Sequence, residues 1–476
     1  MEETPTPHAA ILSSPGMGHQ IPVLELAKRL ITQHNIPVTI LVVTTHTSPA
    51  ESHLLHPPAT TSLNLLRIVQ LPPVDVSSLL DPAAAVVTQL CVMMRAAVPS
   101  VRSALLGLRP RPTSLIVDLF GSESLPVADE FRMAKYVYIT SNAWFAALTC
   151  YCHVFDKEVV GQYVDQTEML RIPGCKPLRP EDVVDPMLDR NDQQYKEYVR
   201  MGVEYSSAHG MLLNTWEDQD PQSLNALRSI VDVPLYPIGP LTKAAEPEAT
   251  NTEVMEWLDQ QPGESVLYVS FGSGGTLSGE QLTELAWGLE MSQQRFVWVV
   301  RPPIDGQVDA SFFSSGNGAV SGAVDFLPDG FVDRTRNSGL IIPLWAPQMK
   351  ILSHPSVGGF LSHCGWNSTL ESLVNGVPII AWPLYAEQRM NAAFLTEELG
   401  VAVRPEVLPT KEVVRREEIE EMVRSVMELE RGKGMRVRAK ELKISGEKAL
   451  SKGGSSYNSF CEVIKDSKLR LESTKF

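Results

Sequence analysis

Short apolar runs alternate with stretches of helical periodicity along most of the chain. The first apolar run is Ala9–Ser13, and the cluster Ser14–Gly18, rich in Gly, Pro and Ser, ends it. Apolar residues between positions 21 and 31 then recur at the three- and four-residue spacing of a helix. Pro22 is expected in the first turn of that helix, where its missing N–H costs nothing. The β-branched run Pro37–Val43 follows and predicts a second buried strand.

Further runs of this kind predict strands in both halves of the chain. In the first half they are Ser114–Val117, Tyr136–Ile139 and Met211–Leu213. In the second half they are Ser265–Ser270, Phe296–Val300, Leu340–Ile342, Val357–Leu361 and Pro378–Trp382. Strands that alternate with helices favour a parallel sheet with helices on both faces. The sequence therefore predicts an α/β protein made of two Rossmann-like parallel-sheet domains that face each other across a cleft.

A change of composition near the middle separates the two predicted domains. Residues 237–252 carry three prolines, a glycine and few apolar residues, as an interdomain linker does. We expect one domain over residues 1–240, the linker itself over 241–252 and a second domain over 253–454. The Gly- and Ser-rich segment Pro302–Val324 lacks periodicity and is expected to be an exposed insertion in the second domain.

The end of the chain is predicted to be helical. Tyr457, Phe460 and Ile464 recur at helical spacing. We expect a C-terminal helix over residues 455–476 that returns to the N-terminal domain.

Charge and cysteine content narrow the possible partners. The chain has 476 residues, of which 41 are Lys or Arg and 56 are Asp or Glu, so its net charge is −15. This excess of acid argues against nucleic acid and anionic membrane as partners, because both need a basic face. Six irregularly spaced cysteines make no disulfide framework. No run reaches about 18 apolar residues, so we expect no membrane insertion and a cytoplasmic protein.

Several polar residues follow predicted strands, where open parallel sheets bind their ligands. They are His19, Asp118, Ser273, the segment His363–Ser368, Glu387 and Gln388. An Asp that hydrogen-bonds one nitrogen of a His leaves the other nitrogen as a general base. His19 and Asp118 are expected on neighbouring strands and so predict such a pair.

The residues of the second half predict an anion site. A helix that begins near Asn367 and Ser368 would present backbone N–H groups and a partial positive charge. Ser273 and His363 would add side-chain donors, or in the case of His363 a charge. An acidic protein could thereby hold a diphosphate with neither a basic patch nor a metal.

Each candidate also has a purely structural interpretation. A His at a helix start and an Asp at a strand end are often structural, and Gly-rich turns such as Phe271–Thr276 are common. Ser368–Glu371 has the spacing of a capping box, so Glu371 could serve only its own helix. Asp218–Asp220 has the pattern Asp-x-Asp of metal-dependent sugar transferases but is better explained as a helix cap.

Three further residues have structural alternatives as well. Trp345 and Trp366 could belong to the core. His363 precedes a cysteine, as in some metal sites, but the sequence has no matched second pair of ligands.

The segment Trp345–Gln388 carries a resemblance to a known family. It begins Trp-Ala-Pro-Gln, contains His-Cys-Gly-Trp-Asn-Ser-Thr-Leu-Glu and ends Tyr-Ala-Glu-Gln. This segment resembles, complete and without gaps, the signature box of plant family 1 UDP-sugar-dependent glycosyltransferases. The motifs Pro15–His19, Asp118–Gly121 and Phe271–Leu277 support it, and the first of them is most similar to the branch that glucosylates hydroquinone, monolignols and other small phenols.

The resemblance implies a GT-B fold and a role for each candidate. His19 would be the general base and Asp118 its partner. The UDP-binding residues would be Trp345 against uracil, Gln348 and Glu371 at the ribose, and Ser273, His363, Asn367 and Ser368 at the diphosphate. The sugar would contact Trp366, Glu387, Gln388 and Thr140, with Gln388 favouring glucose over galactose. Ser14, Leu119, Phe120 and Trp144 would lie where acceptor or sugar contacts occur.

The implied reaction is the inverting, metal-independent transfer of glucose from UDP-glucose to a hydroxyl of a small phenolic acceptor. The N-terminal domain would bind the acceptor and the C-terminal domain the UDP-sugar, in a monomer without a cofactor. One alternative is a non-catalytic nucleotide-sugar sensor of the same fold. Another is an NAD-dependent dehydrogenase, although the chain lacks a strand–GxGxxG–helix unit with an acid about 20 residues further on.

Overall fold

The computed structural model describes residues 7–44, 64–81, 84–243, 252–304 and 323–473. The chain forms two compact units. The first contains Met1–Thr242 together with Lys448–Phe476, and the second contains Lys243–Glu447. The last segment thus joins the first unit at Lys448, before residue 455, where the C-terminal helix was expected to begin. Most of the expected linker and of the expected insertion Pro302–Val324 lies outside the described residues.

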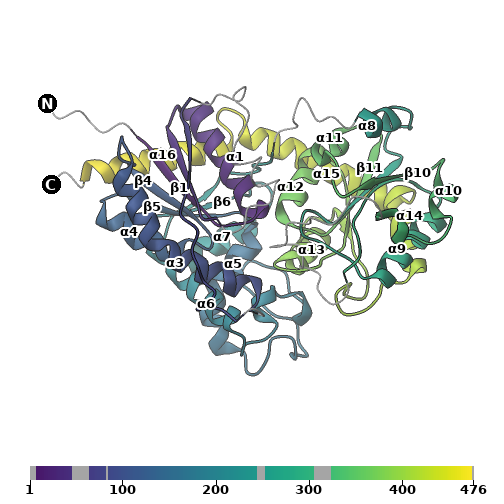
Figure 1. The fold of residues 1–476 in the computed structure, drawn as a ribbon, viewed down its shortest axis with the longest axis horizontal. Coiled ribbons are helices and arrows are strands. Elements are labelled where there is room, and N and C mark those ends of the chain that lie inside the picture. Colours follow the sequence, from purple (N-terminus) through teal and green to yellow (C-terminus); the bar gives the residue numbers. More distant parts are fainter. Residues whose placement is uncertain (1–6, 45–63, 82–83, 244–251, 305–322, 474–476) are drawn as a thin grey trace. The chain divides into compact units, whose positions relative to one another are not determined.

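A parallel sheet of seven strands forms the centre of the first unit, in the order β3–β2–β1–β4–β5–β6–β7. Its strands are β1 (Ala9–Ser13), β2 (Val38–Val42), β3 (Leu66–Gln70), β4 (Ser114–Asp118), β5 (Ala134–Ile139), β6 (Met211–Leu213) and β7 (Leu235–Pro237). Every residue of β1, β2, β4 and β5 is buried, because helices cover the sheet on both faces (Figure 1).

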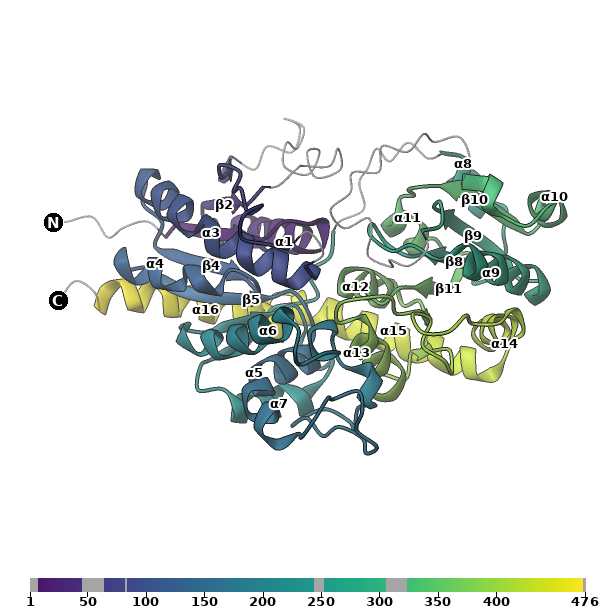
Figure 2. The same ribbon diagram turned by 60° about the horizontal axis from the view of Figure 1, so that its bottom comes forward.

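The helices of the first unit come mostly from the first half of the chain. They are α1 (Met17–His34), α3 (Val86–Gly107), α4 (Leu125–Glu130), α5 (Ala143–Glu158), α6 (Gln193–Glu204), α7 (Pro221–Ile230) and α16 (Ser455–Ser473). Helix α16 lies beside the sheet (Figure 2), and its Phe460 and Val463 join the same hydrophobic cluster as apolar residues of α1 and the sheet. Tyr136 Oη of β5 donates a hydrogen bond to Asp466 Oδ2 at 2.7 Å, which ties this terminal helix to the sheet.

The second unit contains a parallel sheet of six strands in the order β10–β9–β8–β11–β12–β13. They are β8 (Val266–Ser270), β9 (Arg295–Val300), β10 (Gly339–Pro343), β11 (Val357–Ser362), β12 (Ile379–Ala381) and β13 (Ala402–Val403). Its helices are α8 (Thr252–Asp259), α9 (Gly279–Ser292), α10 (Phe331–Thr335), α11 (Gln348–Ser353), α12 (Trp366–Asn375), α13 (Gln388–Ala393) and α14 (Arg416–Met427). A further helix, α15 (Glu430–Leu450), runs across the boundary between the units.

The predicted strands all exist, but three strands were missed. These are β3, β7 and β13, and each lies at the edge of its sheet. Edge position alone does not explain this, because the fourth edge strand, β10, was predicted. In β3 each residue is partly or fully exposed, and β13 has only two residues.

The position predicted for Pro22 was wrong. Helix α1 begins at Met17, so Pro22 lies in its second turn. The early start is possible because Gly16 adopts φ +100°, in which a side chain would be strained, and its carbonyl accepts the N–H groups of His19 and Gln20 at 3.0 Å. The helix therefore contains an internal proline, and His19 lies in its first turn.

Among the described residues, α3 has the length and composition of a helix that could cross a membrane. This is weak evidence, because a core helix of a globular domain passes the same test. Leu90, Met94 and Val101 of α3 are buried within the first unit.

Close packing of α5 on α6 gives a test of the first unit. Gly202 of α6 lies so near α5 that a Cβ at this position would be 2.0 Å from the Thr149 carbonyl oxygen. We expect Gly202→Ala to lower the free energy of unfolding by about 1–3 kcal/mol, because backbone must move to make room. Gly107→Ala at the end of α3 is the matched control, because a Cβ added there would contact nothing within 4 Å. Equal denaturant midpoints for the two variants would contradict this packing.

Candidate active site

The predicted catalytic pair lies where the strand order of the first sheet reverses. Strands β1 and β4 are parallel neighbours, with the remaining strands added on opposite sides of them. His19 follows β1, and Asp118 is the last residue of β4. The distance from His19 Nδ1 to Asp118 Oδ2 is 3.8 Å. The two side chains are neighbours as predicted, but this distance is an ion-pair distance and not the expected hydrogen bond.

Asp118 is held by Ser14 instead. The backbone N–H of Ser14 donates to Asp118 Oδ2 at 2.7 Å, and its hydroxyl donates to Oδ1 at 2.6 Å. Both residues are fully buried. The sequence suggested Ser14 as an acceptor contact, and the structure shows its hydroxyl committed to Asp118. Ser14 therefore fixes the orientation of the carboxylate that faces His19.

Burial controls the protonation of the pair. It lowers the pKa of His19, while the negative charge of Asp118 acts in the opposite direction. Burial also raises the pKa of Asp118, against the charge of His19 and the hydrogen bonds from Ser14. His19 Nδ1 is buried without a hydrogen-bond partner, whereas the side chain as a whole keeps 14% of its exposure. The accessible edge of the ring therefore excludes Nδ1, which faces Asp118.

Other side chains of the first unit support this pair. The Phe120 ring meets the His19 ring edge-on, with centroids 5.2 Å apart. The buried Tyr205 hydroxyl donates to the Leu119 carbonyl at 2.7 Å and fixes the backbone just after Asp118. The expected contacts Leu119, Phe120, Trp144 and Thr140 are all buried within this unit. Their roles toward an acceptor or sugar stay predictions.

The predicted diphosphate residues of the second unit lie at the corresponding reversal. Strands β8 and β11 are parallel neighbours there, and Ser273 follows β8 while His363 follows β11. Two glycines enclose the His363 ring. A Cβ on Gly272 would be 2.5 Å from its Cε1, and a Cβ on Gly365 would be 2.6 Å from its Nε2. The ring can therefore lie directly against the backbone of both loops.

His363 is neutral near pH 7. Burial, with a smaller effect from the charge of Arg301, lowers its pKa to about 4. Of the two roles that the sequence allowed, a hydrogen-bonding group fits and a charge does not. The Nδ1 atom is buried and has no hydrogen-bond partner among the described residues.

The start of α12 corrects the capping-box interpretation. The helix begins at Trp366 with Gly365 as its N-cap, so Ser368 is the third helical residue and cannot cap. Glu371 instead accepts a hydrogen bond from Gln348 Nε2 at 2.7 Å, and the same amide donates to Ser368 Oγ at 2.9 Å. Asn367 and Ser368 lie in the first turn, where the positive end of the helix dipole acts.

The two tryptophans differ. Trp345 follows β10 and keeps 61% of its surface exposed, so the alternative of a core residue was wrong for it. Its open ring is suited to stacking on a planar ligand. Trp366 is buried beside Phe394, with ring centroids 6.1 Å apart, which agrees with its core alternative. Contact of Trp366 with a sugar stays a prediction.

The end of β12 places Glu387 and Gln388 together. Gln388 begins α13, and its Oε1 accepts the N–H groups of Leu384 and Tyr385 at 2.9 and 3.1 Å. Asn391, which sequence reasoning missed, donates through Nδ2 to the Cys364 carbonyl at 2.9 Å and to Glu387 Oε1 at 3.3 Å. The loop after β11 is thus linked to the acid after β12.

The Asp-x-Asp motif forms a helix cap. Asp220 is the N-cap of α7 and accepts the Ser223 N–H at 3.0 Å. The structural alternative is confirmed for this residue. Among the described residues, no group of three His, Cys, Asp or Glu is arranged to hold a metal ion.

Comparison with known proteins identifies the family. A family model described as UDP-glucoronosyl and UDP-glucosyl transferase matches residues 233–430. Anthocyanidin 3-O-glucosyltransferase 5 of Manihot esculenta is 58% identical over 460 residues, 95% of this chain and 93% of its own. The chain belongs to the UDP-glucosyltransferase family.

Two further relatives agree with this assignment. Hydroquinone glucosyltransferase of Rauvolfia serpentina is 43% identical over 98% of this chain and 99% of its own. The structure of Phytolacca americana UGT2 with UDP-2fluoro-glucose and pterostilbene is 40% identical, covers 97% of this chain and 99% of its own, and has a TM-score of 0.87. The two-domain GT-B fold and the similarity to the phenol glucosyltransferase branch are confirmed.

Glu371 of this UDP-glucosyltransferase gives a testable titration. Burial raises its pKa from 4.5 to about 7, opposed by the hydrogen bond from Gln348. Between these pH values the native state holds a proton that the unfolded chain has released, so this residue makes stability fall as pH rises. The effect reaches about 3 kcal/mol at pH 7.

We expect Glu371→Gln to remove this dependence, because the amide oxygen can still accept from Gln348 but cannot ionise. The variant should match the wild type near pH 4.5 and become more stable than it toward pH 7, as measured by urea denaturation. Glu256→Gln on the exposed face of α8 removes the same charge and serves as the control. A constant difference across this range would show that Glu371 is already ionised.

Proposed function

We propose that this UDP-glucosyltransferase transfers glucose from UDP-glucose to a hydroxyl of a small phenolic acceptor, inverts the anomeric carbon and gives a β-glucoside. The observation that carries the proposal is the position of His19 Nδ1, 3.8 Å from the buried Asp118 carboxylate at the strand-order reversal of the first unit. The names of two relatives support the acceptor class, since hydroquinone and anthocyanidins both carry phenolic hydroxyls.

His19 would act as the general base. The acceptor oxygen bonds to the anomeric carbon, its proton passes to His19, and the bond from that carbon to the phosphate oxygen breaks, with its electron pair leaving on UDP. A phenol has a pKa of about 10 and imidazole of about 6.5, so complete proton transfer before attack would cost about 5 kcal/mol. Proton transfer coupled to bond formation avoids that cost, and an alkanol, with its higher pKa, is the poorer acceptor.

The second unit would bind the donor. Trp345 stacks on uracil, Gln348 and Glu371 bind the ribose, and the diphosphate lies on the start of α12. Ser273, His363, Asn367 and Ser368 donate to its oxygens. Fixed donors stabilise the charge that develops on the leaving group, and one such donor is worth about 3–4 kcal/mol. We propose that these groups act without a metal or a cofactor.

In the second unit, the sugar would contact Trp366, Glu387 and Gln388. Because two backbone N–H groups hold the Gln388 carbonyl oxygen, its amide nitrogen is the end left to donate to a sugar hydroxyl. We further propose a cytoplasmic monomer. All six cysteines are free thiols, as a reducing compartment favours.

Mass spectrometry of the purified protein with UDP-glucose and size-matched phenols and alkanols tests the function. We expect phenols to gain one hexose and alkanols to react far more slowly, with unchanged turnover in excess EDTA. UDP binding without any product would favour the non-catalytic sensor. Equal turnover of both acceptor classes would contradict the proposed base, and a loss with EDTA that magnesium restores would contradict metal independence.

His19→Ala tests the base directly. We expect it to lower kcat by about 10²–10⁴-fold, because the proton loses its acceptor, with little change in UDP-glucose affinity, because the donor residues lie in the other unit. His153→Ala in α5 of the same unit is the control. Loss of nucleotide binding in His19→Ala would contradict the role given to this residue.

The pH profile gives a second measurement on the same pair. Since burial lowers the pKa of His19, the neutral base persists below pH 6.5, and the acid limb of kcat/KM should lie under that value. Asp118→Asn removes the charge that opposes this shift and should move the limb further down while it lowers the rate. An acid limb above pH 6.5 in the wild type would contradict a buried neutral base.

A further inference from the structure

Arg301 connects two loops of the proposed donor site. It follows the last residue of β9, at the same end of the sheet as Ser273 and His363. Its Nη1 donates to the Ser273 carbonyl. Its Nε and Nη2 donate to the Leu344 carbonyl at 3.3 and 3.4 Å. One guanidinium therefore joins the loop between β8 and α9 to the loop between β10 and α11.

The two carbonyls belong to the segments that carry the proposed nucleotide contacts. Ser273 is itself a proposed diphosphate residue, and Leu344 directly precedes Trp345, the proposed uracil platform. Leu344 has φ +62°, a conformation that is strained for a branched side chain and persists only when its surroundings hold it. The hydrogen bonds from Arg301 to its carbonyl supply part of that support.

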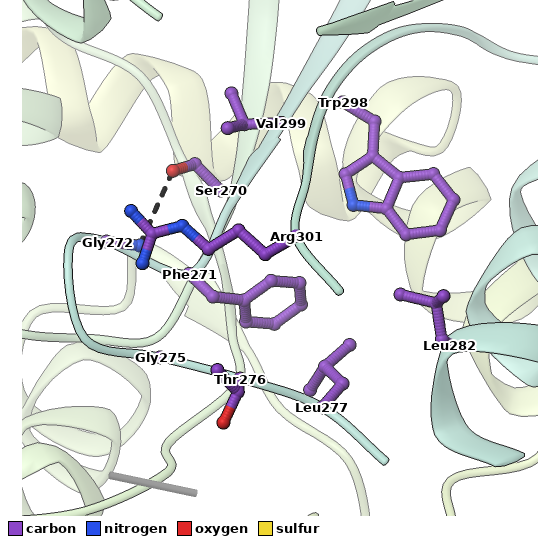
Figure 3. A pocket seen from close by; sticks show the side chains of 10 residues that line it. All are labelled: Ser270, Phe271, Gly272, Gly275, Thr276, Leu277, Leu282, Trp298, Val299 and Arg301. Atoms are coloured by element: carbon purple, nitrogen blue, oxygen red, sulfur yellow. Dashed lines mark hydrogen bonds between the residues drawn. The ribbon is translucent and has the colours of Figure 1, made fainter. Parts of the chain in front are cut away.

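The guanidinium is also unusual in its charge environment. Figure 3 shows Arg301 in a small pocket with Ser270 and Gly272, and Gly272 lies against the His363 ring. Among the described residues, no carboxylate lies within ion-pair distance of Arg301, while burial lowers its pKa. Arg301 is partly buried, and a buried arginine normally has an acidic partner. The guanidinium of Arg301 instead donates its hydrogen bonds to two backbone carbonyls.

We propose that Arg301 is a positioning residue that clamps these two loops, so that Trp345 and Ser273 are already placed when the nucleotide binds. The inference rests on the proposed function and names a residue that its donor site requires. Lysine cannot replace arginine in this role, because a single ammonium lacks the planar fork that reaches both carbonyls. The clamp predicts that uracil binding depends on Arg301, although the guanidinium need not touch the base.

Calorimetric titration with UDP and with uridine distinguishes a positioning role of Arg301 from a purely electrostatic effect on the diphosphate. We expect Arg301→Gln and Arg301→Lys each to weaken UDP binding by about tenfold or more, and uridine binding by a similar factor, because neither side chain can hydrogen-bond both carbonyls. The KM for UDP-glucose should rise more than kcat falls. Full rescue by lysine, or unchanged uridine affinity in both variants, would overturn the clamp in favour of charge alone.

Arg295→Gln is the matched control, because Arg295 begins the strand that Arg301 follows and the variant removes the same charge from the opposite end of β9. It should bind both ligands like the wild type. If Arg301→Gln does not fold, the double variant Arg301→Gln/Leu344→Gly tests the same arrangement, since glycine adopts φ +62° without strain and so lowers the cost of losing the clamp. We expect the double variant to bind uridine more weakly than the wild type, and wild-type affinity there would overturn the proposal.

UDP binding by the wild type distinguishes failure of this inference from failure of the proposed function. A wild type that does not bind UDP contradicts the proposed function itself. A wild type that binds UDP, with Arg301 variants that bind it equally well, contradicts only the clamp.

Discussion

The reversal of strand order in each parallel sheet is the constraint on which both half-sites depend. Chain connections leave β1 and β4 toward opposite edges of the first sheet, and β8 and β11 do the same in the second. The carboxyl ends of these strands are therefore not covered by a crossover helix, and ligands bind at such points in open α/β sheets. His19 and Asp118 occupy one of them, and Ser273 and His363 occupy the other.

The electrostatics of the second unit follow from this placement. A protein of net charge −15 has no general attraction for an anion. Burial keeps His363 neutral, so the positive potential near α12 comes from the helix dipole, from Lys243 and from Arg301, which no described carboxylate neutralises. A local anion site on an acidic protein then needs neither a basic surface nor many charged contacts.

The sequence predicted the parts of the structure that depend on periodicity and on strand ends. Buried central strands such as β1 and β6 were located to the residue, and the expected neighbours His19 and Asp118 are close. Three of the four edge strands were missed: β7 and β13 have only three and two residues, and β3 has no buried residue, so none of them carries a long apolar run. The carboxyl-end rule could also have found Arg301, which directly follows a predicted strand.

Partner choice within the site was harder to predict than position. The hydrogen bonds from Ser14 to Asp118 were not predicted, and the structural alternative for Glu371, a cap of its own helix, missed its pairing with Gln348. Both partners were missed for one cause. Spacing along the chain fixes which residues share an element, whereas a side chain's partner depends on the element packed against it, and that element is distant in sequence.

The hydrogen bonds from Ser14 also explain how a weak base can serve the proposed reaction. Ser14 orients both oxygens of Asp118, and the carboxylate lies 3.8 Å from His19 without a hydrogen bond to the ring. Its main effect on His19 is Coulombic, and that attraction becomes strong only when the ring gains a proton. Protonation accompanies bond formation, so Asp118 stabilises the transition state more than the ground state, and only such a difference accelerates a reaction.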